Sequence, residues 1–339
     1  MRTFSRTRLS VLAVAAAVVA APAVAQGGSR PDSALPTSDP QASTYGPNYV
    51  FSPTAVEARL AGDPFQIVGI RDNRWQGDRT QQTDIQFSDG RRIRVKWAKA
   101  PPGGFAINNQ PRYEAAAYAF QKLFFDEADW VVPPTVIREL PLTAYRQLDP
   151  EAEPTFEGTG SVLVAVQYWL QNVDAAEAPD TARLGGDPAY ARRLGYLNLF
   201  THLIRHVDSN PGNVLVSTRG PPRLYAVDNG VAFRSPASPR GTVWRDLHVD
   251  RVPGEAVERL RRLTRGELDD ALYVVAQFRV REDGRLERVP PTAKIDENRG
   301  VPREEGMIQF GLTNLELDEL WARIRTVLDR VDAGELETF

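Results

Sequence analysis

The sequence contains no cysteine and, beyond its N-terminus, no long apolar run. Without cysteine the chain can form neither a disulfide bond nor a thiolate metal site, and it has no attachment site for a bacterial-type lipid anchor. Its stability must therefore come from a packed core. At 339 residues the chain is long enough for a sizeable core in about two domains or lobes.

Lysine is also scarce, and positive charge is not in excess. The formal charge is −3, and the basic residues are almost all arginine, since the only lysines are Lys96, Lys99, Lys122 and Lys294. Removal of the three arginines near the N-terminus would change the charge from −3 to −6. Nucleic-acid-binding proteins usually present a basic face, so no nucleic-acid partner is expected.

The N-terminal residues 1–25 have the pattern of a signal peptide. Three arginines precede an apolar run over residues 9–21, and Ala23-Val24-Ala25 offers a small-x-small cleavage site. The run is shorter than the roughly 20 residues of a membrane span. We therefore predict a cleaved bacterial-type signal, export to the periplasm or the medium, and no stable membrane anchor.

The next segment, residues 26–50, is rich in Gly, Ser, Pro and polar residues, which predicts a disordered linker. Residues 51–170 are expected to form a first lobe. Apolar and polar residues alternate from about 63 to 100, with a hairpin turn at Asp89-Gly90, which predicts a small antiparallel sheet. The segment 112–125 contains strong helix formers and predicts a helix.

The second predicted lobe, residues 171–339, is mainly helical. Its predicted helices include 189–207, a helix that follows Thr264 and the C-terminal helix that follows Thr313, and both threonines have the pattern of helix N-caps. A hairpin is predicted over 278–289. The apolar face expected to pack in the C-terminal helix comprises Leu315, Leu317, Leu320, Trp321 and Ile324.

Two short segments that follow the predicted helix 189–207 carry acidic and amide side chains. "HVDSNPGN" contains Asp208 and Asn213, and "YAVDNG" contains Asp228. In a phosphotransfer site Asp208 would accept the proton of a substrate hydroxyl, while Asn213 and Asp228 would hold a divalent metal ion against nucleotide phosphates. Their oxygen donors suit Mg²⁺ or Mn²⁺.

The first lobe supplies a matching cation. Lys96 lies on the polar side of its predicted strand, and Glu114 on the following helix could pair with it and hold it near the phosphates. Lys99 is an alternative to Lys96, because a shift of one residue in the strand reverses the face that a side chain occupies.

These residues resemble the protein-kinase-like superfamily, and in particular the secretory-pathway kinases related to the Golgi casein kinase and the spore-coat kinases. "YEAAAYAFQKLF", "VVPPTVIREL" and "YAVDNGVAF" carry the resemblance, which covers about residues 63–235. It implies a two-lobed α+β fold, ATP or another nucleoside triphosphate with Mg²⁺ or Mn²⁺ as cofactors, and transfer of the γ-phosphoryl group to an unidentified hydroxyl-bearing acceptor.

Two features depart from the pattern of ordinary protein kinases. The glycines Gly69 and Gly77 are isolated and do not form a glycine-rich phosphate loop. Val207 stands where those kinases have an arginine before the catalytic aspartate, as if regulation by phosphorylation of an activation loop were absent.

Other interpretations of the same residues stay open at this point. Asp208 and Asn213 are also common turn residues. The spacing His202, His206 and Asp208 could ligate zinc, although it lacks the glutamate of the metalloprotease motif. Tyr168 and Trp169 could line an adenine pocket or belong to the core.

Two other functions also fit the sequence. Because nucleoside triphosphate is scarce outside the cytoplasm, the chain could be an inactive pseudokinase that acts as a periplasmic binding or scaffold protein. A kinase-fold nucleotidyl transferase would retain the metal and phosphate recognition with the substrate reversed. The acceptor, the preferred metal and the oligomeric state leave no signal in the sequence.

Overall fold

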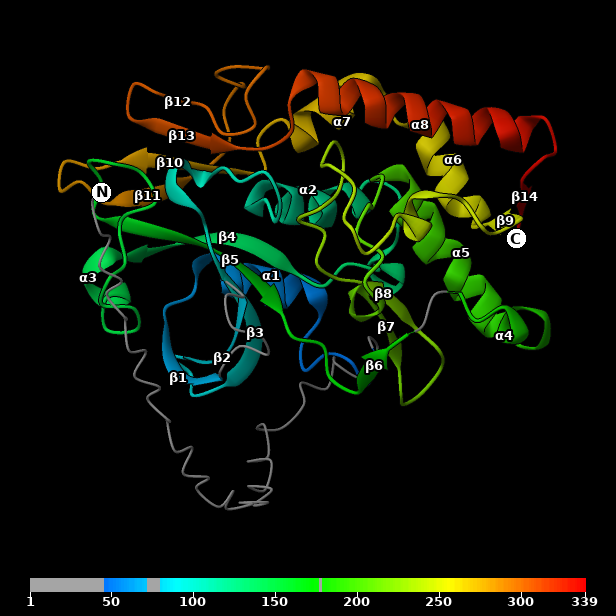
Figure 1. Ribbon diagram of the computed structural model, residues 1–339, viewed down its shortest axis with the longest axis horizontal. Helices are drawn as coiled ribbons and strands as arrows, with labels where there is room; N and C mark the ends of the chain where they lie inside the picture. Colours follow the sequence, from blue (N-terminus) through cyan, green and yellow to red (C-terminus); the bar gives the residue numbers. More distant parts are fainter. Residues whose placement is uncertain (1–45, 72–79, 177–178) are drawn as a thin grey trace, which may run out of the picture. The chain divides into compact units, whose positions relative to one another are not determined.

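The computed structural model describes residues 46–71, 80–176 and 179–339. They form an α+β fold with an antiparallel-sheet lobe and a mainly helical lobe, which confirms the predicted fold class (Figure 1). The helices are α1 Pro53–Gly62, η2 Pro102–Gly104, α2 Pro111–Gln121, η3 Glu127–Asp129, α3 Leu142–Tyr145, α4 Thr181–Gly186, α5 Pro188–Leu203, η4 Pro211–Asn213, η5 Val243–Arg245, α6 Gly254–Arg262, α7 Arg265–Leu272 and α8 Asn314–Asp332. The strands are β1 Phe65–Arg71, β2 Thr80–Phe87, β3 Arg92–Lys99, β4 Thr135–Pro141, β5 Ser161–Tyr168, β6 Val173–Ala175, β7 Val214–Ser217, β8 Leu224–Ala226, β9 Arg251–Val252, β10 Ala276–Val280, β11 Leu286–Val289, β12 Arg303–Glu304, β13 Met307–Phe310 and β14 Glu337–Thr338.

The first lobe is built on a five-stranded antiparallel sheet with the order β1-β2-β3-β5-β4. The hairpin between β2 and β3 turns at Gly90, whose φ of 83° is easily reached only without a side chain. Along β3, Ile93, Val95 and Trp97 are buried in the core. Since successive strand residues point to opposite faces, Lys96 lies on the other face of the sheet.

Strand β5 is buried along its whole length, which explains why its sequence is a nearly continuous apolar run. Val162, Val164 and Val166 pack in the same core cluster as Leu60 of α1. Leu163 packs in a second cluster on the opposite face.

The opposite face is covered by a four-stranded sheet with the order β11-β10-β13-β12. Phe278 of β10 and Phe310 of β13 share a core cluster with Ile137 of β4 and Leu163 of β5. The hairpin predicted over 278–289 is present as β10 and β11. Residues 276–310 therefore pack on the first-lobe sheet although they follow most of the second lobe in sequence.

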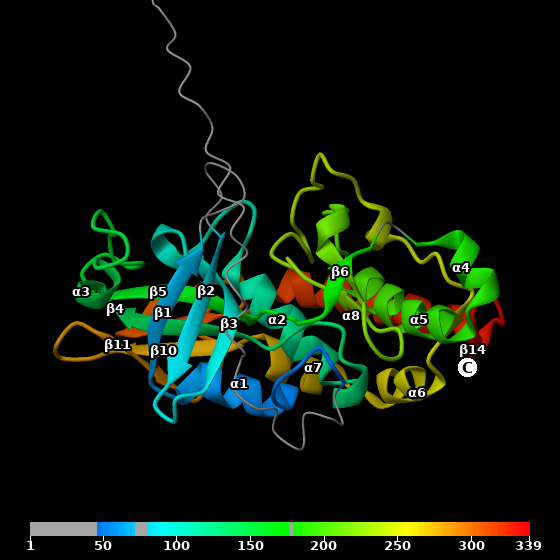
Figure 2. The same ribbon diagram turned by 90° about the horizontal axis from the view of Figure 1, so that it is seen from below.

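The helical lobe packs α5, α6, α7 and α8 around one large core that also includes α2. Helices α5 and α8 are in contact, and α5 lies in front of α8 in the view of Figure 2. Thr264 and Thr313 form the N-caps of α7 and α8, each with a capping box, as predicted. The apolar face predicted for α8 is wrong at Leu315, which is 54% exposed because it lies on the solvent side of the first turn.

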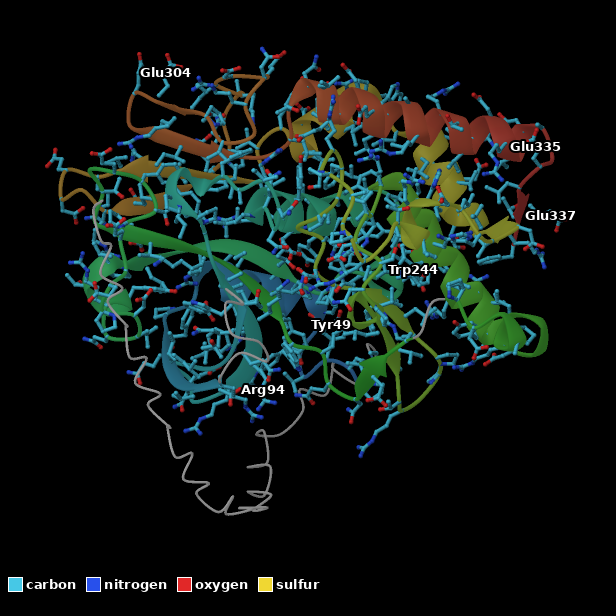
Figure 3. All side chains as sticks on the ribbon, in the orientation of Figure 1. Tyr49, Arg94, Trp244, Glu304, Glu335 and Glu337 are labelled. Atoms are coloured by element: carbon cyan, nitrogen blue, oxygen red, sulfur yellow. The ribbon has the colours of Figure 1, made fainter. Side chains whose placement is uncertain are left out.

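The structure corrects the end of the predicted linker. Residues 46–50 are not a disordered segment, since Asn48 and Tyr49 are buried and Asn48 donates to the carbonyl oxygens of Gln171 and Asn172. Tyr49 packs in the first-lobe core (Figure 3). Helix α1 follows, and the sequence pattern did not predict it. The predicted signal peptide, residues 26–45 of the linker and Gly77 lie outside the described residues.

Candidate active site

A cleft of about 910 Å³ lies between the first sheet and the segment that leads into β7. This volume is within the range of roughly 300–1,000 Å³ that is typical of small-molecule sites. Lys96, Asn213 and Asp228 line it, so three residues that are far apart in the sequence meet at one surface. Its other polar lining residues include Gln82, Asn108, Asn109, Gln167, Asp174, Asn210 and Arg240.

Lys96 is held between two carboxylates. Its Nζ donates to Oε1 of Glu114 and to Oδ1 of Asp228, and each distance is 2.9 Å. An ammonium group has three donors, so one N–H remains for another acceptor. The alternative cation, Lys99, instead forms an ion pair with Asp149 at 3.1 Å. The structure therefore favours Lys96 over Lys99 as the cation of the site.

Glu114 lies in the first turn of α2, where a negative charge is favoured by the helix dipole. Its Oε2 accepts a hydrogen bond from the backbone N–H of Asn229 at 3.0 Å. One carboxylate thus binds both Lys96 on β3 and the segment that follows Asp228. The two parts of the site are joined through α2.

The backbone around Asp228 is tightly constrained. Asp228 has a φ of 60°, a left-handed conformation that aspartate tolerates better than most residues. Two residues later, a Cβ on Gly230 would approach Cα of Asn109 to 2.9 Å. Gly230 also accepts a hydrogen bond from the backbone N–H of Gln110 at 3.0 Å. The close approach of α2's N-terminus explains the glycine in Asp-Asn-Gly.

Asn213 connects the loop with Asp208 to the segment with Asp228. Its Nδ2 donates to the backbone carbonyl of Asp208 at 3.0 Å. The backbone carbonyl of Asn213 accepts a hydrogen bond from the N–H of Val227 at 2.8 Å. Since the amide nitrogen is used in this way, the amide oxygen is left for another ligand.

Asp208 is 4% exposed and lies beside an arginine of the cleft wall. Its Oδ2 is 3.5 Å from Nη1 of Arg240, while its Oδ1 has no hydrogen-bond partner within the described part of the chain. Backbone hydrogen bonds from Ser238 to Val207 and from Ser209 to Gly241 hold the two segments together. A buried acceptor oxygen without a donor fits a group that binds a substrate hydroxyl.

The charged groups of the site shift one another's pKa values. Burial alone would lower the pKa of Lys96, but Asp228 and Glu114 outweigh burial and raise it. The charge of Lys96 lowers the pKa of Asp228. Burial raises the pKa of Glu114 against the opposing effect of Lys96. Burial also lowers the pKa of His206, despite the nearby charges of Asp208 and Asp228, and so favours a neutral imidazole.

The residues present fit a divalent metal ion with hard-ligand preferences. Asp228 uses one carboxylate oxygen for Lys96, and its side chain is 36% exposed at the cleft. Together with the amide oxygen of Asn213, it gives two oxygen donors, and Mg²⁺ commonly takes its other ligands from water and phosphates. Among the described residues no three or more His, Asp or Glu side chains form a metal-binding group. The zinc interpretation of His202, His206 and Asp208 is therefore not supported.

The two aromatic residues predicted to line an adenine pocket differ in position. Both border the cleft, but the ring of Tyr168 is 2% exposed and stacks on Tyr49 in the core with ring centroids 5.2 Å apart. For the ring of Tyr168 the structure therefore favours the core alternative, although the residue also borders the cleft. Trp169 is half-buried at the cleft and is available to a ligand.

Sequence reasoning missed Arg240 and the pair Arg112–Glu316. Arg240 lies in a loop without a recognisable motif, and its relation to the site follows from its place in the cleft lining and its distance from Asp208. Arg112 precedes Glu114 on α2 by two residues, and its guanidinium group forms a buried ion pair with Glu316 of α8 at 2.6 Å. The acid at the third position after Thr313 signalled a helix cap but not this partner.

No protein-family profile matches the chain, and no curated protein sequence matches it. Among solved structures, the Golgi casein kinase with manganese and ADP bound matches with a TM-score of 0.47 and 14% identity, over 84% of this chain and 77% of that chain. A MAP kinase from Leishmania major matches with a TM-score of 0.29 and 13% identity, over 52% and 48%. Both are kinases, the class that the sequence resembles. TM-scores and sequence identities this low support no argument about activity.

Within the described ranges no helix is long and apolar enough to cross a membrane.

Proposed function

We propose that this chain is an exported kinase-like phosphotransferase, which moves the γ-phosphoryl group of ATP or another nucleoside triphosphate to a hydroxyl group of a protein, glycan or small molecule. The contact of Lys96 with both Glu114 and Asp228, at 2.9 Å each, carries the proposal. Such an arrangement fixes a cation and a metal-type carboxylate in one cleft wall, which is what phosphoryl transfer requires for positioning and charge neutralisation.

Each polar residue has one role in this proposal. Asp208 orients the acceptor hydroxyl and takes its proton, using the carboxylate oxygen that has no other donor. Lys96 uses its third N–H to bind phosphate oxygens. Asn213 and Asp228 would hold Mg²⁺ or Mn²⁺, which when bound neutralises phosphate charge. Glu114 does not touch the substrate and keeps Lys96 in place.

The first experiment measures nucleotide binding separately from catalysis. The unfolding free energy of the mature chain is measured with ADP plus Mn²⁺, with ADP alone and with Mn²⁺ alone. A ligand at a hundredfold excess over its Kd stabilises the folded state by about 2.7 kcal/mol. We expect that increase only with nucleotide and metal together, and we expect Asp228→Asn to abolish it.

Asp84→Asn is the matched control, because Asp84 is also a partly exposed carboxylate paired with a cation, but on β2 and outside the cleft lining. It should retain the full increase. If ADP stabilises the wild-type chain neither with Mn²⁺ nor, in a repeat of the measurement, with Mg²⁺, the phosphotransferase proposal is wrong and the scaffold function becomes the better one.

The second experiment measures group transfer with ATP labelled at the γ- or the α-phosphate and a mixture of hydroxyl-bearing acceptors. We expect transfer of the γ-label and its loss in Asp208→Asn, with nucleotide binding preserved. Transfer of the α-label would instead identify a nucleotidyl transferase. Export is checked by locating the processed chain in the periplasmic fraction or the medium.

A further inference from the structure

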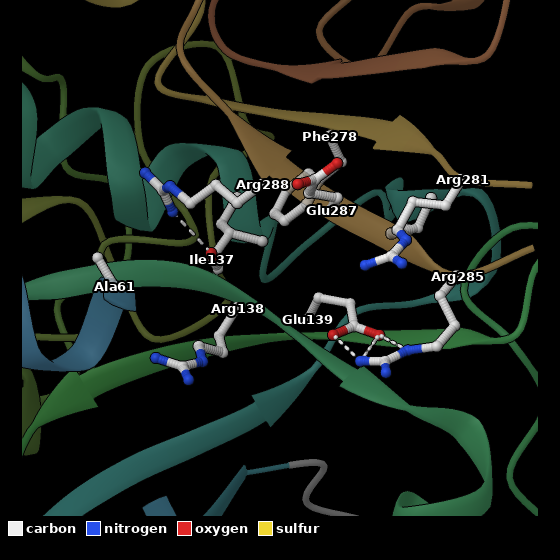
Figure 4. A pocket seen from close by; sticks show the side chains of 10 residues that line it. Ala61, Ile137, Arg138, Glu139, Phe278, Arg281, Arg285, Glu287 and Arg288 are labelled. Carbon is white, nitrogen blue, oxygen red and sulfur yellow. Dashed lines mark hydrogen bonds and ion pairs between the residues drawn. The ribbon is translucent and has the colours of Figure 1, made fainter. Parts of the chain in front are cut away.

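A second, smaller cavity of about 240 Å³ lies between the two sheets, away from the cleft (Figure 4). Strand β4 forms one side, the hairpin of β10 and β11 forms the other, and Ala61 near the end of α1 lies at one edge. Its lining is unusually charged and comprises Arg138, Glu139, Arg281, Arg285, Glu287 and Arg288.

The two glutamates in this cavity are already neutralised. Glu139 pairs with Arg285, with oxygen–nitrogen distances from 3.1 to 3.4 Å, and this bidentate pair crosses from β4 to the hairpin. Glu287 pairs at 2.7 Å with Arg279, which does not line the cavity. Four arginines and two glutamates line the cavity, so positive charge is in excess there.

Arg138 and Arg288 form no ion pair with any carboxylate in the described ranges of the chain. Arg138 donates to the backbone carbonyls of Leu60 and Asp63, at 2.8 and 2.7 Å, and Arg288 donates to the carbonyl of Ile137 at 2.9 Å. Desolvation lowers the pKa of both guanidinium groups, although the carboxylates of Glu139 and Asp63 partly offset this for Arg138, and that of Glu57 for Arg288.

The hydrogen bonds to carbonyls show how both side chains help to join α1, β4 and β11. A guanidinium group has five N–H donors, of which these bonds use two in Arg138 and one in Arg288. The unused donors lie at a cavity smaller than a typical drug-sized site. Arg281 also lines the cavity, and its ion pair with Asp283 is long, at 3.7 Å.

We propose that this cavity binds a phosphate-type oxyanion, a phosphate or sulfate group whose oxygens accept hydrogen bonds from Arg138 and Arg288. Planar guanidinium groups match the geometry of such oxygens and bind them more strongly than neutral donors do. The anion would also place a negative charge between β4 and β11, and so hold the two sheets together. This site is independent of the function proposed for the cleft.

The test is binding of inorganic phosphate by calorimetry to the mature wild-type chain, with chloride at equal ionic strength as the reference. Arg288→Gln retains a donor for the Ile137 carbonyl but removes the charge, and we expect it to weaken phosphate binding about tenfold or more. Arg279→Gln is the matched control, because Arg279 is also exposed and on the same hairpin, but its charge is already neutralised by Glu287. It should bind phosphate like the wild type.

Arg288→Lys keeps the charge without the planar fork and should give intermediate affinity, which keeps the test valid if the glutamine variant folds poorly. Glucose 1-phosphate distinguishes the source of the group: tighter binding than inorganic phosphate indicates a phosphate ester, and equal or weaker binding indicates a free anion. Equal phosphate affinity in wild type and Arg288→Gln, or equal loss in Arg279→Gln, would overturn the proposal.

Discussion

Removal of one partner from the buried ion pair between α2 and α8 should strongly destabilise the fold. The side chains of Arg112 and Glu316 are each 5% exposed. Arg112 donates to both carboxylate oxygens of Glu316, at 2.6 and 2.7 Å, and also to the carbonyl of Gly311, Oε1 of Gln110 and the hydroxyl of Tyr113. Replacement of Glu316 by Gln keeps the shape of the side chain but leaves the buried guanidinium group without a counter-charge.

Removal of one partner from a buried pair costs about 3–5 kcal/mol of unfolding free energy. We expect the low end, about 3 kcal/mol, for Glu316→Gln, because the amide oxygen still accepts one hydrogen bond. That is a large part of the total of about 5–15 kcal/mol that is typical of folded domains. The measurement is urea unfolding followed by circular dichroism and fluorescence, so that coincident curves verify a single transition.

Glu319→Gln is the matched control on the same helix. Glu319 pairs with Arg234 at 3.2 Å and, at the longer distance of 3.9 Å, with Arg323. Because the side chain of Glu319 is 38% exposed, its loss should cost about 0–1 kcal/mol. The double variant Arg112→Met, Glu316→Leu should be more stable than Glu316→Gln, since no buried charge is left unpaired. A cost for Glu316→Gln within 1 kcal/mol of the control would refute the reasoning.

The same pair predicts a pH dependence. Burial alone would raise the pKa of Glu316, but Arg112 outweighs it, and the net effect lowers the pKa below its ordinary value of 4.5. A carboxyl group with a lowered pKa stabilises the folded state above its unfolded pKa and loses that contribution as the pH falls through the folded value. The stability difference between wild type and Glu316→Gln should therefore be constant near neutral pH and shrink only below about pH 4.5.

Two further predictions concern the cleft and the second sheet. Lys96→Arg should lower the transfer rate about 100-fold with little change in stability, because a planar fork cannot occupy the position of a point charge between Glu114 and Asp228 and displaces them; steady-state kinetics would test this, and near-normal rates would contradict it. Gly311→Ala should cost about 1–3 kcal/mol or more, because its Cβ would lie 2.1 Å from the backbone oxygen of Tyr273. Gly266→Ala on α7 meets nothing within 4 Å and should instead stabilise the chain by about 0.5–1 kcal/mol; urea unfolding of both variants decides whether the contact matters.

Local sequence patterns predicted the elements whose periodicity and capping residues are self-contained. The alternation around Ile93, Val95 and Trp97 predicted β3 and the outward position of Lys96, and Thr264 and Thr313 predicted two helix starts. The signals for α1 were also present, since Ser52 caps it and Pro53 is its first residue. They were overlooked because they directly follow a segment with the composition of a linker.

Features that depend on contacts between distant residues could not be predicted in this way. Nothing near Gln309 indicates that its amide would be buried and would donate to Oε1 of Gln277, 32 residues away. The packing of β10 and β13 on the first sheet likewise depends on contacts between residues that are distant in the sequence. In the cleft, the residue types and spacing predicted that Lys96, Glu114 and Asp228 meet, whereas the place of Arg240 depends on the path of a loop.

The three attachments of α2 limit how the site can be controlled. The N-terminal part of this helix is bonded to β3 through Glu114 and Lys96, to the segment after Asp228 through Asn229 and Gly230, and to α8 through Arg112. Rotation of α2 away from β3 would break a buried ion pair and so cost at least about 3 kcal/mol. At that cost, under about 1% of molecules would be in the rotated state. If the cleft transfers phosphoryl groups as proposed, its rate would be set by the concentrations of nucleotide and acceptor, as in a constitutively active enzyme.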